Sequence, residues 1–248
     1  MFSDKFSARF MGLALIGAAI TIPAAASAGV VVKSSGPSAG TYPVGQQVAD
    51  SSSITLRAGD KITVLTDGGT RVLQGPGTFR VGEGATRTRS QFSSLTRRGN
   101  RSRARTGAVR GGSVSTGNPN LWFVNVAASG PVCLYDLEAV RLWRPVAEVA
   151  QTYQFRDQTT QSSLDVNFVG TESLRVLDPE GLMLEDGNTY TVTAPAGEDG
   201  ESASVEMTFV KLTDEDLSPG ELAQTLIEKG CMTQLGQLAD RMEASAGR

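Results

Sequence analysis

Few side chains in this chain could do chemistry, and the most informative residue type is missing, because the sequence contains no histidine. Imidazole is the usual general base near neutral pH and the commonest metal ligand. Its absence excludes Ser-His-Asp and Cys-His catalysis and every histidine-dependent metal site. Two cysteines cannot form a four-thiolate site, no lysine has a Ser-x-x-Lys partner, and spacing singles out no acid-base carboxylate pair. We therefore expect no catalysis, no metal and no cofactor.

Cys133 and Cys231 are the only cysteines. Residues 1–28 have the pattern of a signal peptide, described below, which predicts export. An even number of cysteines in an exported chain favours a disulfide, because the compartment outside the cytoplasm is oxidising. Closing a loop of about 100 residues stabilises a fold by roughly 4 to 5 kcal/mol in the chain-entropy model, as an upper figure. The alternative is two buried, unpaired thiols.

Eight arginines lie between Arg87 and Arg110, a stretch without acidic residues. Guanidinium groups bind phosphates and carboxylates in bidentate geometry, so this segment predicts contact with an envelope protein or with an anionic envelope polymer or lipid. Nucleic acid is not expected, because stacking aromatic residues are missing apart from Phe92. The alternative is a solvated linker. The candidate contact residues are Arg97, Arg98, Arg101, Arg103 and Arg105.

Acidic residues gather in the second half, where residues 133–248 contain 21 acidic and 8 basic side chains. Residues 29–132 have the opposite balance, with 13 basic and 4 acidic side chains, so the two halves attract each other or face different partners. The acidic clusters at 178–186, 198–201 and 214–216 lack EF-hand spacing, and we interpret them as turns.

Three aromatic residues, Trp122, Trp143 and Tyr153, have two interpretations. They are the large side chains of a β-sandwich core, or they form a platform on which a sugar stacks. The core interpretation is favoured.

The first 28 residues have the pattern of a signal peptide. Lys5 and Arg9 precede an apolar run, and Ala26-Ser27-Ala28 supplies the small residues that signal peptidase needs. As a membrane-spanning helix the segment is marginal, because it barely reaches the required length and contains Pro23. We expect cleavage after Ala28, a mature chain in the periplasm, and no transmembrane span in that mature chain.

The mature chain divides by pattern into four parts. Residues 29–82 alternate apolar and polar side chains between glycine-rich turns, which predicts a β domain of meandering hairpins. Residues 83–118 are rich in Arg, Gly and Ser, and we interpret them as a linker or long loop with one helical turn near Gln91–Arg98. Strand patterns over 119–213 predict an Ig-like β-sandwich.

Residues 214–248 predict a helical tail. Ser218, Pro219 and Glu221 match a capping box with proline in the first turn, and Gly230 separates two helices. A Cys133–Cys231 bond would attach this tail to the sandwich edge.

The stretch Ile54–Leu73, with its Ala-Gly-Asp and Asp-Gly-Gly turns between strands, resembles the FecR-like domain. The resemblance covers 30–81 and implies a β domain of the bacterial envelope. Signal-relaying members carry a cytoplasmic segment, whereas only nine residues precede the apolar run here. Gly130–Leu134, Val140–Pro145 and Gly230–Leu235 resemble the C-terminal part of uncharacterised exported proteins that contain such a domain.

These observations predict a mainly β, exported, non-catalytic protein that acts as a binding or sensing adaptor through its FecR-like domain. The alternative is a carbohydrate-binding module or carbohydrate-active enzyme of the envelope.

Overall fold

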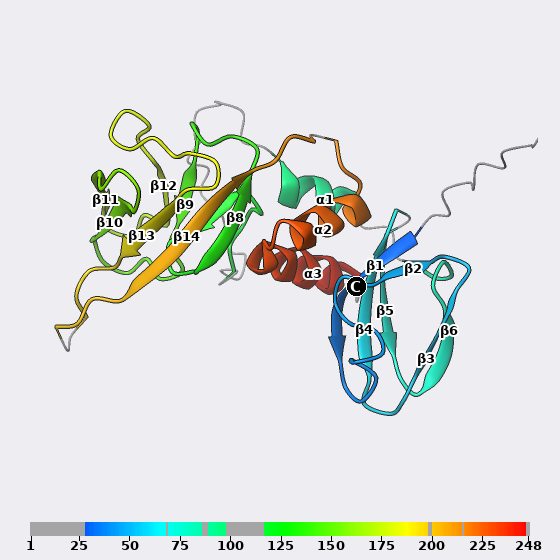
Figure 1. Ribbon diagram of the computed structural model, residues 1–248. Helices are drawn as coiled ribbons and strands as arrows, with labels where there is room; N and C mark the ends of the chain where they lie inside the picture. Colours follow the sequence, from blue (N-terminus) through cyan, green and yellow to red (C-terminus); the bar gives the residue numbers. More distant parts are fainter. Residues whose placement is uncertain are drawn as a thin grey trace, which may run out of the picture.

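The computed structural model describes residues 28–67, 69–85, 89–97, 117–197, 200–214 and 216–246. The fold is mainly β, with helices at the C-terminus, as the sequence predicts. Two β units lie at opposite ends of the molecule in Figure 1, and the C-terminal helices lie between them. Each β unit has its own hydrophobic core, and a third core surrounds the helices.

The first β unit contains a four-stranded sheet in the order β2-β1-β4-β5 and a two-stranded sheet of β3 and β6. Side chains of β1 alternate between two cores: Val31 faces the core shared with β3, whereas Val30 and Val32 face the helices. The strands are β1 (Ala28–Ser35), β2 (Gln47–Ala49), β3 (Ser53–Leu56), β4 (Lys61–Thr66), β5 (Gly69–Gln74) and β6 (Gly77–Arg80).

The predicted meander of hairpins is present only in part: β1 pairs with β2 and β4 with β5, but β3 pairs with β6 across the β4–β5 hairpin. The physical reason is burial on both faces of the main sheet. Ile62 and Val64 of β4 need a cover opposite the helices, and Ile54 of β3 supplies part of it.

Asp60, the last residue of the Ala-Gly-Asp turn after β3, stabilises this turn through its side chain. The buried carboxylate accepts hydrogen bonds from the backbone N–H of Ser38 at 2.8 Å and of Arg57 at 2.5 Å. Desolvation by itself raises the pKa of Asp60, but the hydrogen bonds from Ser38 and Arg57 outweigh it, and the pKa lies below its usual value. Asp60 therefore holds the 36–38 loop against this turn.

The second β unit has two sheets over one core. A five-stranded sheet runs in the order β11-β10-β13-β14-β8, and a three-stranded sheet in the order β12-β9-β7. Phe155, Tyr190 and Phe209 of the larger sheet pack against Val124 and Leu142 of the smaller one. The strands are β7 (Phe123–Asn125), β8 (Gly130–Leu134), β9 (Arg141–Trp143), β10 (Gln151–Asp157), β11 (Ser163–Phe168), β12 (Leu174–Val176), β13 (Thr189–Thr193) and β14 (Ser204–Lys211).

Arg144, directly after β9, is completely buried, which the sequence pattern did not indicate. Its guanidinium donates hydrogen bonds to the backbone carbonyls of Val149, Gly170 and Glu172, each at 2.6 Å. It also donates to the side-chain oxygen of Gln151 at 3.1 Å. Arg144 thereby fixes the two loops on either side of β10 and β11.

The helices are α1 (Arg89–Thr96), α2 (Pro219–Glu228) and α3 (Met232–Ala246). The capping box at Ser218 and Glu221 is confirmed, and Gly230, with φ +74°, separates α2 from α3. Leu222, Leu226, Leu235 and Leu238 of α2 and α3 form the third core with Val30, Val32 and Leu65 of the first β unit. None of the described helices has the length and apolar character that a bilayer crossing requires.

Candidate functional site

The predicted disulfide is present: Cys133 of β8 is bonded to Cys231, and their Cα atoms lie 6.0 Å apart. Both residues are buried. Because Cys231 directly precedes α3, the bond ties the start of this helix to β8, which is the edge strand of the five-stranded sheet.

Gln234 makes a second link between the same two elements. Its side-chain Oε1 accepts a hydrogen bond from the backbone N–H of Cys133 at 2.7 Å. Its Nε2 donates to the carbonyls of Cys133 at 2.8 Å and Leu121 at 3.0 Å. The buried amide therefore occupies the edge of β8 as a neighbouring strand would. The sequence pattern did not single out Gln234, which lies three residues after Cys231 in the first turn of α3.

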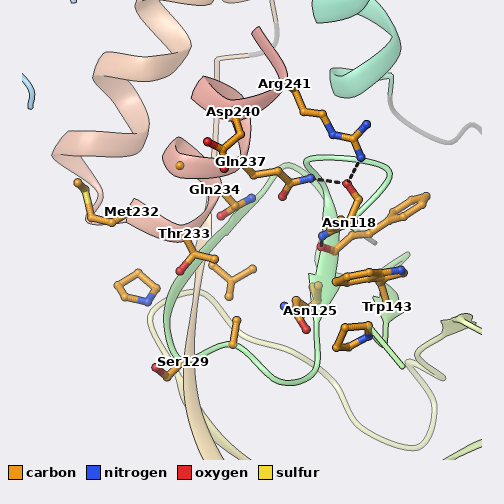
Figure 2. A pocket seen from close by; sticks show the side chains of 18 residues that line it. Asn118, Asn125, Ser129, Trp143, Met232, Thr233, Gln234, Gln237, Asp240 and Arg241 are labelled. Carbon is orange, nitrogen blue, oxygen red and sulfur yellow. Dashed lines mark hydrogen bonds between the residues drawn. The ribbon is translucent and has the colours of Figure 1, made fainter. Parts of the chain in front are cut away.

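A groove of about 500 Å³ lies between α3 and the edge strands β7 and β8 (Figure 2). Its apolar surface includes Pro131, Trp143 and Met232. Met232 has half of its surface exposed, whereas Trp143 has only 7% exposed. This combination gives the groove an apolar wall that a ligand can reach.

Hydrogen bonds connect α3 to the segment before β7, which also lines the groove. Gln237 Nε2 and Arg241 Nη2 both donate to the backbone carbonyl of Asn118, at 3.0 and 2.9 Å (Figure 2). The Asn118 side chain in turn donates to the carbonyl of Phe123 at 2.6 Å, at the start of β7. The segment before β7 is thus anchored to the helix.

Several polar atoms in the groove are open to a ligand. The hydroxyls of Ser129 and Thr233 make no hydrogen bond to any residue that the structure describes. Asn125 accepts a hydrogen bond from the N–H of Ala127 through its Oδ1, which leaves its side-chain NH₂ group as a donor.

Two charged residues, Asp240 and Arg241, are among the described residues that line the groove. Asp240 is ion-paired with Lys33 of β1, and Glu243, one turn further along α3, contacts Lys61 and lies 3.4 Å from Lys33. The groove-lining helix is therefore connected to the first β unit as well as to the second.

These ion pairs shift the pKa values of Lys33 and Glu243. The hydrogen bond to Asp240 is the main cause that raises the pKa of Lys33, and it outweighs desolvation. Burial by itself raises the pKa of Glu243, but Lys61 and Lys33 outweigh it and hold the pKa below the usual value.

Most of the predicted arginine contacts lie outside the described residues: Arg98, Arg101, Arg103 and Arg105. Arg97 is described and its side chain is exposed directly after α1, while its carbonyl accepts a hydrogen bond from Asn120 Nδ2 at 3.0 Å. The predicted signal peptide spans residues 1–28, and residues 1–27 also lie outside the described part of the chain. Ala28 is the first residue of β1.

The three aromatic residues considered for a sugar platform do not form one. Only Trp143 lines the groove. Trp122 donates its Nε1–H to the carbonyl of Thr96 at 2.7 Å, and Tyr153 packs edge-on against Phe168 at 5.6 Å between ring centroids. Trp122 and Tyr153 therefore have packing roles.

Acidic side chains in the predicted turns bind backbone groups: Asp178 accepts from the N–H of Glu180 and Asp186 from that of Lys211. Across the part of the chain that is described, no cluster of three acidic or cysteine side chains could hold a metal ion.

Comparison with known proteins adds no relative: no protein-family model, no curated protein and no solved structure matches this chain.

Proposed function

We propose that the protein is an exported, non-catalytic binding or sensing adaptor of the bacterial envelope that holds its ligand in the groove beside α3. In this proposal signal peptidase cleaves after Ala28 and the mature chain acts in the periplasm. The first β unit corresponds to the FecR-like domain and the second to the Ig-like sandwich. The Cys133–Cys231 disulfide supports an oxidising, extracytoplasmic location.

The position of α3 carries this proposal. The helix supplies Thr233 and Gln237 to the groove. The disulfide beside its first turn binds the second β unit, and the last turns bind the first β unit through Glu243. A ligand in the groove would therefore touch the element that connects both units, which is the arrangement that an adaptor needs.

The groove chemistry supports binding rather than catalysis. Asp240 is the carboxylate among the described lining residues, and it is ion-paired with Lys33. Acid-base catalysis needs a proton donor and acceptor placed on the same reacting group, and one paired carboxylate does not supply both.

Site-specific photo-crosslinking tests the proposal. The mature chain, residues 29–248, carries a photo-reactive residue at Met232 in the groove, or at Met183 as the control, since Met183 is 69% exposed and does not line the groove. After incubation with envelope extract we expect saturable capture of one component at position 232 and none at 183.

A second change tests whether the groove itself is responsible. Thr233→Trp places a bulky ring in the groove at an exposed position and should abolish capture. Thr159→Trp, in the exposed turn between β10 and β11, should leave capture unchanged. Equal capture by both variants, or no difference between positions 232 and 183, would reject the proposal.

A further inference from the structure

We infer that the groove beside α3 binds a neutral saccharide. This inference rests on the proposed function, because it names the ligand class of the same groove. Three observations favour it: the capped strand edges, the balanced charge, and the pairing of apolar surface with open hydroxyl and amide groups.

Several backbone groups on the strand edges that border the groove already have partners. The backbone N–H and C=O of Cys133 on β8 bind the Gln234 side chain, and the carbonyl of Phe123 on β7 binds Asn118. Pro131, which also lines the groove, has no N–H to offer. An extended peptide therefore has no continuous ladder to join here, and recognition must come from side chains.

The described residues that line the groove carry no excess of either charge. They include one negative side chain, Asp240, and one positive side chain, Arg241. Asp240 forms an ion pair with Lys33, and Arg241 donates to the carbonyl of Asn118. Phosphate or carboxylate ligands need an excess of positive charge, and cations need an excess of negative charge. The described lining residues supply neither excess, which favours an uncharged ligand.

The remaining surface matches the two faces of a sugar. Sugar hydroxyls donate and accept hydrogen bonds, and the Ser129 and Thr233 hydroxyls and the Asn125 NH₂ group are open to them. Sugar C–H faces are apolar, and Pro131 and Met232 present exposed apolar surface on the same groove. A volume of about 500 Å³ lies within the usual small-molecule range of roughly 300 to 1,000 Å³.

Isothermal titration calorimetry with defined sugars tests the inference. The neutral probes are maltohexaose, cellohexaose and chitohexaose, the anionic probe is oligogalacturonate, and the phosphate probe is inorganic phosphate. We expect the mature chain to bind at least one neutral hexasaccharide, and to bind neither anionic probe more tightly. Thr233→Trp should weaken that binding by at least about tenfold, whereas Thr159→Trp should leave it within about twofold.

The outcomes separate this inference from the proposed function. The saccharide inference is wrong if no neutral hexasaccharide binds at millimolar concentration. If photo-capture from envelope extract still depends on Thr233 in that case, and protease treatment of the extract abolishes it, the ligand is a protein. If an anionic probe binds more tightly than the neutral ones, the inference is also wrong. If neither sugar binding nor photo-capture depends on Thr233, the inference and the proposed function both fail.

Discussion

The side-chain amide of Gln234 pairs with both backbone groups of Cys133: its Oε1 lies 2.7 Å from the Cys133 nitrogen, and its Nε2 lies 2.8 Å from the Cys133 oxygen. Cys133 also forms the disulfide with Cys231, so one covalent bond and several hydrogen bonds join the start of α3 to β8. Buried backbone groups that lose their partners are costly, which makes this junction sensitive to substitution.

Gln234→Leu should lower the free energy of unfolding by about 2 to 4 kcal/mol, because it keeps the side-chain size and leaves buried backbone groups of Cys133 and Leu121 unpaired. Urea denaturation followed by circular dichroism measures this. Gln154→Leu, at an exposed position of β10, is the control and should change stability by less than about 0.5 kcal/mol. Equal effects of the two variants would contradict the role assigned to Gln234.

Removing the disulfide should destabilise the fold by about 3 to 4 kcal/mol, because the unfolded chain regains the freedom that a 98-residue separation had lost. The measurement compares urea midpoints of the mature chain with those of the Cys133→Ala, Cys231→Ala double variant. Adding a reducing agent should shift the wild-type midpoint and leave that of the variant unchanged. A wild-type midpoint that does not respond to reductant would show that the bond contributes no stability.

Arg144→Lys should destabilise the second β unit by about 2 to 4 kcal/mol. Lysine keeps the charge but cannot reach the carbonyls of Val149, Gly170 and Glu172 in the fork geometry of a guanidinium. Limited proteolysis should then cut within residues 145–150 or 169–173. Arg156→Lys, exposed on β10, should retain the wild-type cleavage pattern, and an unchanged pattern for both variants would contradict a clamping role for Arg144.

Glu243 should make the contact between α3 and the first β unit sensitive to acid. Its folded pKa lies below the ordinary value of 4.5, so its stabilising effect is fully present above pH 4.5 and is lost as the pH falls through the folded pKa. Glu243→Gln should therefore cost about 1 kcal/mol at pH 7, since Lys33 and Lys61 are about half exposed.

The difference between Glu243→Gln and wild type should shrink as the pH is lowered below 4.5. Unfolding free energies at a series of pH values measure it. Glu228→Gln, exposed at the end of α2, is the control and should show no such pH-dependent difference. A constant difference across the pH range would exclude the ion pairs as its cause.

Replacing Arg97, Arg98, Arg101, Arg103 and Arg105 with serine should weaken retention of the mature chain on vesicles that contain anionic lipid, because their guanidinium groups supply positive charge. Co-sedimentation at low and at physiological salt measures it. If the variant is retained as well as the wild type at both salt concentrations, the predicted anion contact is wrong and the segment is a linker.

Local patterns predicted much of the secondary structure. Alternation over residues 29–82 correctly predicted strands such as β3 and β4, and the capping box correctly placed the start of α2. These features depend on residues close together in the chain, so their signal is present in the sequence. The pairing of β3 with β6 could not be predicted in this way, because it depends on which buried face needs a cover.

The groove needed the tertiary structure for the same reason. Ser129, Trp143 and Thr233 come from separate segments and carry no common spacing signal. The sequence presents Trp143 and Trp122 as equal aromatic candidates, and only the fold distinguishes them: Trp143 lines the groove, whereas the ring of Trp122 lies against Tyr135. Arg144 has no sequence signal either, because most arginines are exposed and only the surrounding carbonyls make its burial favourable.

By itself, the sequence determined the absence of imidazole chemistry, the mainly β composition and the pair of cysteines available for one bond. These properties follow from residue types and from short periods along the chain. Only the tertiary structure decided that α3 joins both β units, with Cys231 near one end of the helix and Glu243 near the other, and that a groove opens beside it. The physical reason is that such a site forms where surfaces from distant segments are buried together, and burial depends on the whole fold.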